Sequence, residues 1–274
     1  MQIPVRMATT MTVTTMMKMK TAFLSLCLTA IVFACCTTFA QVTVGGNAKI
    51  GGAVTMGASS GGGAIAFDAV SNATPITSGN TISWTHTGGS CSSGCVIFVC
   101  VAGDTDFAGT GTVTATYNGV TMTRIIAVED GASVLGSDAF ILPLGTSVGT
   151  HTVQVTSSGS AGTAVTGAAT SWSGVNQTTP NRTVTNATGP GSASPITVTA
   201  SNALSGDVVV DCMNVYGNSS TIASGTTPRY VVKNISSTAV SMGTSSAVAT
   251  GSQVMNYTGT PDSYWNIGAV PLIP

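Results

Sequence analysis

Apolar and polar residues alternate with a period of two along much of the chain, which is the pattern of β-strands. Residues 112–117 alternate threonine with valine and alanine, and residues 151–156 place two valines on one side and two threonines and a glutamine on the other. Such alternation is typical of a strand with one face on a core and the other in water. No stretch shows a sustained helical period, so we expect an all-β protein.

Strand signals of this kind recur at short intervals from residue 64 onward. The runs 96–101 and 208–210 are continuously apolar and predict central strands covered on both faces. Asn118-Gly119 lies between two alternating runs and predicts a tight hairpin. The expected strands are 64–70, 81–86, 96–102, 112–117, 120–128, 137–142, 150–156, 163–172, 196–200, 207–213, 229–233, 247–254 and 264–272. So many short strands predict an antiparallel β-sandwich, of the jelly-roll type.

Residues 1–40 have the features of a secretory signal peptide. Lys18 and Lys20 precede an uncharged apolar stretch, and Ala40 is a small residue at the position that a signal peptidase reads. We expect cleavage before Gln41, with Met17 or Met19 as an alternative start of the chain. The apolar stretch is shorter than the ~20 residues of a membrane span. A transmembrane anchor is therefore the weaker interpretation, and we expect no membrane span after cleavage.

Two features near the leader leave alternatives open. Residues 32–35 partly resemble a lipobox, so a lipid anchor on Cys35 is the alternative to free secretion. Residues 41–63 are glycine-rich and contain a six-residue repeat of about two units, too few for a solenoid, which needs ~3. We expect a linker or a frayed edge strand there. The predicted organisation is a signal peptide (1–40), a linker (41–63) and one sandwich domain (64–274).

Charge is scarce in this chain and limits the kinds of partner. Charged residues make up 6% of the sequence, against roughly 25% in ordinary domains, while hydrophobic residues make up 43%. Threonine, serine, glycine and asparagine thus replace charge, and the apolar content argues against disorder. Five basic and nine acidic residues remain after the leader, a net charge of −4. These charges are scattered, so we expect no nucleic-acid binding.

Four cysteines follow the leader: Cys91, Cys95, Cys100 and Cys212. An even number in an exported chain predicts disulfides, although four cysteines allow three pairings. We favour Cys91 with Cys95 across a short loop, and Cys100 with Cys212 because both lie in strongly apolar strands. Zinc is the weaker alternative, since only the first two have the spacing of a zinc-binding pair.

The residue types that perform acid–base chemistry are rare. His86 and His151 are the only histidines, and we expect both on the polar, solvent-facing sides of strands. No G-x-S-x-G motif accompanies them. A glycoside hydrolase would need two carboxylates flanking the bond, and most of the nine acids fall at predicted turns or strand ends. We therefore expect a protein that is not an enzyme.

Two weak ligand sites can be named. Asp104 and Asp106 alternate in a loop after a central strand and could hold calcium, although a calcium ion needs six to eight oxygens and the alternative is a solvated turn. We expect no other cofactor. Trp172 and Trp265 are expected in the core. Trp84 has polar neighbours and is the candidate contact for a sugar ring, with three tyrosines as alternatives: Tyr216, Tyr230 and Tyr257.

Six segments together resemble a β-sandwich domain of unassigned activity that occurs in secreted bacterial proteins and phage virion proteins. The most distinctive is 173–180, Ser-Gly-Val-Asn-Gln-Thr-Thr-Pro; the others are 82–87, 117–123, 149–155, 206–211 and 265–270. The cysteines are not part of that pattern. The resemblance implies the fold and a surface location, and it carries no catalytic residues.

We therefore expect a non-catalytic extracellular or cell-surface module with a structural or adhesive role. Its partner would be a polysaccharide, a cell wall or a protein surface, because a surface of threonine, serine and asparagine offers many weak hydrogen bonds and no focused field. The alternative is a carbohydrate-binding module, which needs an exposed aromatic side chain. A glycoside hydrolase-like enzyme is the third reading.

Overall fold

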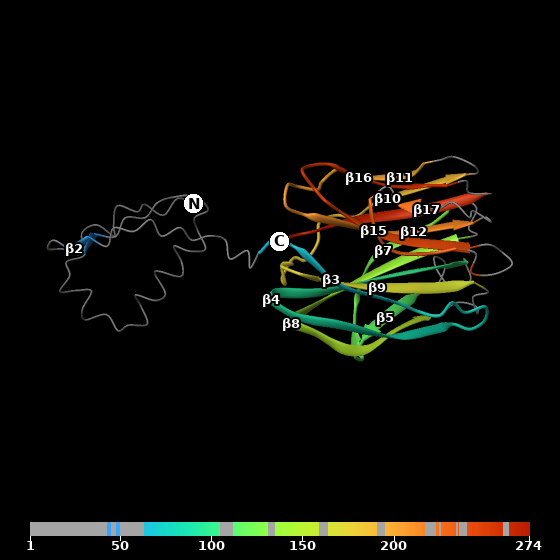
Figure 1. The fold of residues 1–274 in the computed structure, drawn as a ribbon, viewed down its shortest axis with the longest axis horizontal. Coiled ribbons are helices and arrows are strands. Elements are labelled where there is room, and N and C mark those ends of the chain that lie inside the picture. The colour runs from blue at the N-terminus through green and yellow to red at the C-terminus, as the bar shows by residue number, and fades with distance from the viewer. Residues whose placement is uncertain are drawn as a thin grey trace, which may run out of the picture. The chain divides into compact units, whose positions relative to one another are not determined.

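The computed structural model describes residues 63–104, 112–130, 135–158, 164–190, 195–216, 226–233, 235, 240–259 and 263–274, with the short strands 43–44, 48–49 and 223–224. The chain divides into two units, Met1–Ala58 and Ser59–Pro274. In the first unit, β1 (Thr43–Val44) pairs with β2 (Ala48–Lys49). The second unit is built of antiparallel β-sheets packed on one another (Figure 1), which confirms the predicted β-sandwich. The jelly-roll order stays a prediction.

The described residues of the second unit form three sheets. The seven-stranded sheet contains β3 (Ala66–Asn72), β4 (Thr81–Asp104), β5 (Val113–Tyr117), β6 (Val120–Thr121), β7 (Thr123–Glu129), β8 (Leu135–Ser157) and β9 (Val165–Ser173). The five-stranded sheet contains β10 (Thr185–Pro190), β12 (Val208–Tyr216), β14 (Thr227–Val232), β15 (Val240–Val248) and β17 (Tyr264–Leu272). The three-stranded sheet contains β11 (Ile196–Ala200), β13 (Ala223–Ser224) and β16 (Gln253–Thr258).

The two longest strands, β4 and β8, fold the seven-stranded sheet back over itself. Residues 81–90 of β4 pair with residues 147–156 of β8, and residues 95–104 pair with residues 135–145. The first set, with β5 and β6, forms one layer, and the second set, with β3, β7 and β9, forms the next. The five-stranded and three-stranded sheets follow in order, so the domain has four layers.

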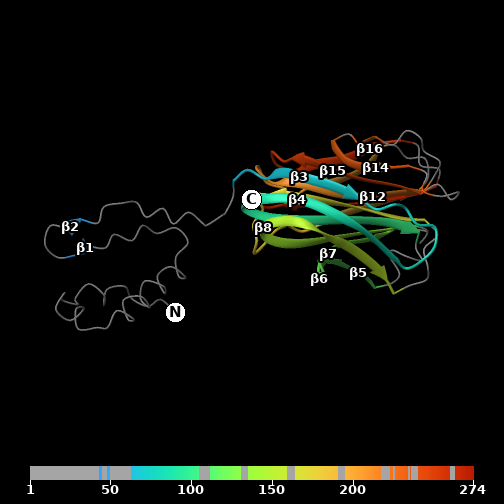
Figure 2. The ribbon, with the colours of Figure 1, turned by 60° about the horizontal axis from the view of Figure 1, so that its bottom comes forward.

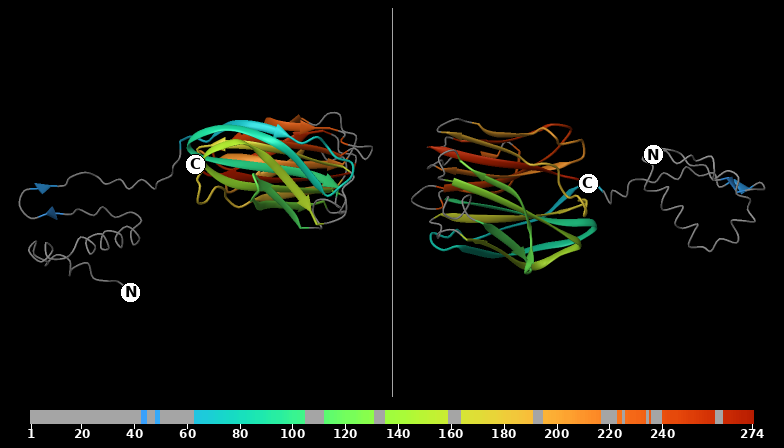
Figure 3. Two further views of the ribbon diagram at one scale, coloured as in Figure 1. Left: turned by 90° about the horizontal axis from the view of Figure 1, so that it is seen from below. Right: turned by 180° about the vertical axis from the view of Figure 1, so that it is seen from behind.

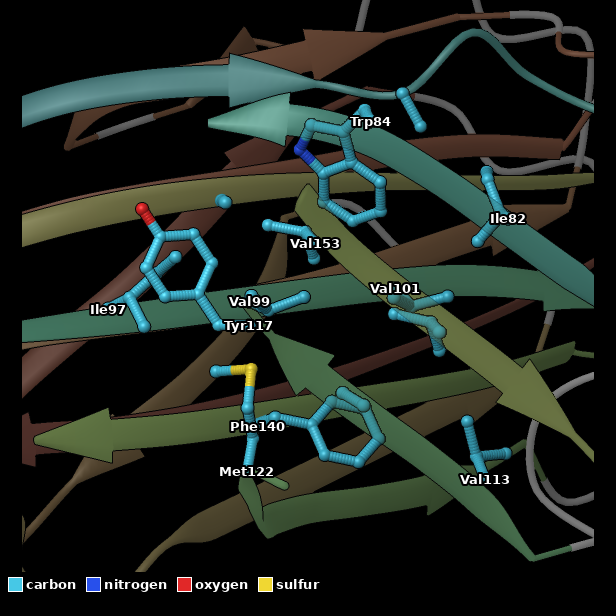
Figure 4. Packing of buried hydrophobic residues seen from close by; sticks show 14 of the residues in the cluster. Ile82, Trp84, Ile97, Val99, Val101, Val113, Tyr117, Met122, Phe140 and Val153 are labelled. Carbon is cyan, nitrogen blue, oxygen red and sulfur yellow. The ribbon is translucent and has the colours of Figure 1, made fainter. Parts of the chain in front are cut away.

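Each space between two layers is filled by its own hydrophobic core. The first core lies between the two layers of the seven-stranded sheet (Figure 4), the second against the five-stranded sheet, and the third between the five- and three-stranded sheets. In β4, Ile97 and Val99 face the first core while Val96 and Phe98 face the second. Both central layers are thus apolar on both faces, as predicted for 96–101 and 208–210.

The fold of β4 on itself occurs at a bulge. Ser90 pairs with Ser147 and Cys95 pairs with Gly145, so four residues of β4 stand opposite one residue of β8. A disulfide between Cys91 and Cys95, with Cα atoms 5.5 Å apart, closes the bulge. Gly145 has φ +73°, a conformation that glycine adopts without the steric cost of a Cβ atom. The chain therefore changes direction at one place in both strands.

The hairpin predicted at Asn118-Gly119 is confirmed. Asn118 and Gly119 have φ of 52° and 76°, and Tyr117 of β5 pairs with Val120 of β6 on either side of them. Positive φ at both central positions is the requirement of a type I′ turn, which asparagine and glycine meet best.

Three parts of the strand prediction were wrong. The expected strand 120–128 is two strands, β6 and β7, which pair with β5 and with β8 respectively. The expected strand 247–254 is the end of β15, a turn and the start of β16. β10 was not predicted, because its sequence Thr-Asn-Ala-Thr-Gly-Pro is rich in turn residues. β10 lies at the edge of the five-stranded sheet, where proline is tolerated because one side of the strand needs no ladder hydrogen bonds.

Candidate functional site

The outward side chains of the first layer form one polar surface on four neighbouring strands. Figure 2 shows three of these strands, β8, β5 and β6, on the same side of the domain. All of these side chains but two are exposed, and the two are half-buried. We call this surface the threonine face; its members are Thr81, Ser83, Thr85, Thr87, Thr114, Thr116, Thr121, Thr150, Thr152, Gln154 and Thr156.

The threonine face is uncharged and carries no aromatic ring. The strand segments that build it, 81–90, 112–121 and 146–158, contain no Asp, Glu, Lys or Arg. Their aromatic side chains, Trp84 and Tyr117, are 8% and 1% exposed and point into the first core. Any partner of this surface therefore meets hydroxyl, methyl and amide groups alone.

Trp84 does not lie where a sugar-contacting residue must. It shares the inner face of β4 with Ile82, and Figure 4 shows its ring inside the first core. Its indole N–H donates a hydrogen bond to Oγ of Ser71 on β3, 3.1 Å away. The expectation of an exposed Trp84 was wrong, because its polar neighbours Ser83 and Thr85 belong to the opposite face of the same strand.

The three tyrosines that were the alternative candidates for sugar contact are not fully exposed either. Tyr257 is fully buried in the third core, and Tyr216 and Tyr230 are half-buried. Trp172 and Trp265 are 1% and 7% exposed, which confirms that both belong to the core.

His86 is also buried, which corrects the expectation of a solvent-facing side chain. It has no exposed surface, and Nδ1 of its ring lies 2.8 Å from Oγ of Ser71. His86 pairs across the sheet with His151, which is half-buried with its ring 5.4 Å from that of Tyr117. The signal that places both histidines on the inner side of their strands is the register: His86 is two residues from Trp84, on the same side of β4, and it pairs with His151.

The neutral imidazole of His86 beside the Ser71 hydroxyl supplies two of the three groups of a serine nucleophile site. The third group would be a carboxylate that orients the imidazole, and the nearby carboxylate has other partners. Activation of a serine also requires a group that orients the base. The carboxylate of Asp68 instead accepts hydrogen bonds from the Ser171 hydroxyl at 2.7 Å and the Gly89 N–H at 2.9 Å. The cluster therefore connects β3 to β4 and β9, and its chemistry is that of a structural hydrogen-bond network.

Burial gives His86 a measurable signature. Its removal from water lowers the pKa of the imidazole to about 4, against a smaller raising effect of Asp68. We expect the ring proton signals of His86 to titrate near pH 4 in an NMR titration, assigned by their loss in His86→Gln. Titration near the ordinary value of 6.5 would instead place the ring in water.

Asp138, Asp207 and Asp211 are buried and held by specific partners. Asp207 forms a two-point ion pair with Arg182, with N–O distances of 2.6 and 3.1 Å, and Asp138 pairs with Arg124. Burial raises the pKa of Asp138 to about 6, with Arg124 acting in the opposite direction. Asp211 has no such cation among its hydrogen-bond partners in the described residues and is treated separately below.

Only one of the two residues predicted to bind calcium lies among the described residues. Asp104 is half-buried at the end of β4, and Asp106 lies outside the described residues. Within the described residues, no group of three or more histidine, cysteine or carboxylate side chains is placed to hold a metal ion. The predicted leader, including Cys35, and most of the predicted linker also lie outside the described residues.

The cysteines pair as favoured from the sequence. Cys91 is bonded to Cys95, and Cys100 of β4 is bonded to Cys212 of β12 with Cα atoms 5.4 Å apart. The second disulfide crosses the second core and joins the seven-stranded sheet to the five-stranded sheet. Two such bonds are typical of proteins from an oxidising compartment.

The distinctive segment 173–180 has a structural role. The side-chain oxygen of Asn176 accepts hydrogen bonds from the N–H groups of Thr178 and Thr179, both at 3.0 Å, which fixes a turn. The amide of Gln177 accepts a bond from the N–H of Gly145, where β8 bends. The N–H of Asn176 donates to the carbonyl of Ile273, 2.8 Å away. The segment thus connects the bend of the sheet to the C-terminal strand.

Comparison with known protein families, curated proteins and solved structures found no match to this chain. Among the described residues there is no helix long and apolar enough to cross a membrane.

Proposed function

We propose that the domain is a non-catalytic extracellular module that adheres to uncharged, hydroxyl-bearing surfaces through the threonine face. The observation that carries this proposal is the neutral polar face itself, spread over four strands without one charged or aromatic side chain. Hydroxyl groups both donate and accept hydrogen bonds, so they match polysaccharides, cell-wall polymers and other hydroxyl-rich surfaces. Each contact is weak, and adhesion comes from their number.

The contacts of four buried titratable groups support a non-catalytic role. General acid–base catalysis needs a group that can reach a substrate proton. His86, Asp138, Asp207 and Asp211 are each at most 1% exposed, and each is hydrogen-bonded to protein side chains. The disulfides and the signal-like leader support export, and the burial of Trp84 counts against the carbohydrate-stacking alternative, for which Trp84 was the first candidate.

Sedimentation with insoluble neutral polysaccharides tests the proposal. The exported protein should co-sediment, and Thr85→Lys should weaken binding about tenfold, because a lysine ammonium at the centre of the contact loses hydration without gaining a counter-charge. Thr199→Lys, an exposed change on β11 in the three-stranded sheet, is the matched control and should bind as the wild type does.

Binding should also change little between low and high salt, since screening acts on charged pairs. A strong salt dependence, or equal losses in both lysine variants, would contradict adhesion through the threonine face.

A further inference from the structure

The threonine face is ordered in two dimensions. Strand pairing aligns its side chains in rows across the strands: Thr114–Thr156–Thr81, Thr121–Thr116–Gln154–Ser83, Thr152–Thr85 and Thr150–Thr87. Neighbouring strands in a sheet lie ~4.8 Å apart, and two residues along a strand span ~6.8 Å. The hydroxyl groups therefore occupy a lattice with one repeat across the strands and a longer repeat along them.

The hydroxyl positions on this lattice are restrained. Threonine is branched at Cβ, which limits its χ1 rotamers, so the backbone largely sets where each hydroxyl and methyl group lies. Thr81 and Thr156 also hydrogen-bond to each other across the strands, with their oxygens 3.2 Å apart. Beneath them, Ile82 and Val155 are 2% and 0% exposed in the first core. The face is supported from below by close packing.

Charge and shape narrow the choice of partner. The strand segments that build this face, 81–90, 112–121 and 146–158, contain no Asp, Glu, Lys or Arg, so the complementary partner is neutral as well. A single sugar chain would be held best by stacking on aromatic rings, but Trp84 and Tyr117, which lie in these segments, point into the core. The remaining match is a surface that is itself a periodic, uncharged array of hydrogen-bonding groups.

We propose that this surface is ice, and that the threonine face binds the crystal lattice of water. The inference rests on the proposed function and names its partner. Hexagonal ice presents hydrogen-bonding oxygens on repeats of the same scale as the strand and residue spacings. Each threonine offers a hydroxyl that bonds to a lattice water and a methyl that fills the space between waters. Charged side chains, which hold liquid water more strongly, are absent from the segments 81–90, 112–121 and 146–158.

Partition into growing ice tests this proposal. Ice is grown slowly from a dilute solution of the fluorescently labelled exported protein, and the protein is measured in the ice and in the remaining liquid. We expect enrichment in ice for the wild type and for Thr199→Lys, and a loss of at least about tenfold for Thr85→Lys and Thr152→Lys. Thr152→Ser, which keeps the hydroxyl but frees its rotamer, should fall between them. Thermal unfolding of each variant confirms that it is folded.

The outcomes separate the two proposals. Exclusion of the folded wild type from ice overturns the present inference. If that protein nevertheless sediments with a neutral polysaccharide and Thr85→Lys weakens the sedimentation about tenfold, the proposed function stands with a different partner. If the wild type binds neither ice nor polysaccharide, both proposals fail. Enrichment that survives Thr85→Lys and Thr152→Lys places ice binding elsewhere and also overturns the inference.

Discussion

Replacing Cys100 and Cys212 together by alanine will lower the free energy of unfolding by about 5 kcal/mol, whereas the same double change at Cys91 and Cys95 will lower it by about 2 kcal/mol. The difference follows from loop length. The Cys100–Cys212 disulfide joins residues 112 positions apart, and the Cys91–Cys95 disulfide joins residues 4 positions apart. A cross-link removes more conformational entropy from the unfolded chain when it closes a longer loop.

Chemical denaturation without reductant, on the wild type and the two double variants, measures this effect. For a domain of this size the larger loss corresponds to a fall of about 10–20 °C in melting temperature. The pair at the bulge is the matched control, because its cysteines are buried as well, at 4% and 0% exposure. Equal losses for the two pairs would show that the change in core packing, and not loop closure, dominates the stabilisation.

Changing Asp211 to asparagine will remove a fall in stability that the wild type shows as pH rises from about 4 to about 7. Asp211 of β12 is fully buried between the five- and three-stranded sheets. The Tyr257 hydroxyl donates to its Oδ1 at 2.8 Å, and the Ser245 N–H donates to the same atom at 2.6 Å. The Ser245 hydroxyl lies 2.7 Å from Oδ2. Burial raises the pKa of Asp211 to about 7, and these hydrogen bonds lower it less.

The sign of this effect follows from proton binding. Between pH 4 and 7 the unfolded chain has lost the Asp211 proton and the folded protein has kept it, so stability falls with rising pH. A raised pKa of about three units corresponds to about 4 kcal/mol at most. Asparagine resembles the protonated acid, because its NH₂ can donate to the Ser245 hydroxyl at every pH. The variant should therefore match the wild type near pH 4 and exceed it at pH 8.

The difference between the two unfolding curves isolates Asp211 from other groups. Asp138, whose pKa is also raised, contributes a fall in the same direction, and His86, whose pKa is lowered, contributes a rise between about pH 4 and 6.5. Asp207→Asn is the control. Whereas Asp211→Asn should raise stability at pH 8, Asp207→Asn should lower it there, because it removes the ion-pair partner of Arg182. Parallel curves for Asp211→Asn and the wild type at all pH values would contradict the prediction.

The sequence predicted the fold where the hydrophobic pattern was strong. The continuous apolar run 96–101 identified a central strand, and the Asn118-Gly119 turn and the strand Tyr264–Leu272 are observed as expected. The number of layers was not predictable, because it depends on where β4 and β8 fold back on themselves. Local pattern does not reveal that fold: Thr81–Asp104 reads as two strands whether or not they belong to one sheet.

The candidate site was harder to predict, because the face on which a side chain lies depends on whether its position along the strand is odd or even. Side chains point alternately to the two faces of a strand, so a residue lies on the same face as the residues two positions before and after it. Sequence neighbours suggested that Trp84 and His86 were exposed, but both share the inner face with Ile82. The same parity collects Thr81, Ser83, Thr85 and Thr87 on the outer face. Their alignment with β8 and β5 depends on strand register, which only the folded sheet supplies.

The segment 173–180 has a consequence for how this domain can be joined to others. This segment contacts the first and the last residues of the domain's chain. Gly174 lies so close to the start of the domain that an added Cβ would be 2.8 Å from the carbonyl oxygen of Ala64. The N–H of Asn176 donates a hydrogen bond to the carbonyl of Ile273 near the end of the domain. Figure 3 shows the C-terminus beside the start of β3 in both views. A unit whose entry and exit points meet can be placed inside a surface loop of a host protein without pulling the host apart. We expect the domain to tolerate circular permutation as well, because a short linker can join the two ends while the chain is opened elsewhere.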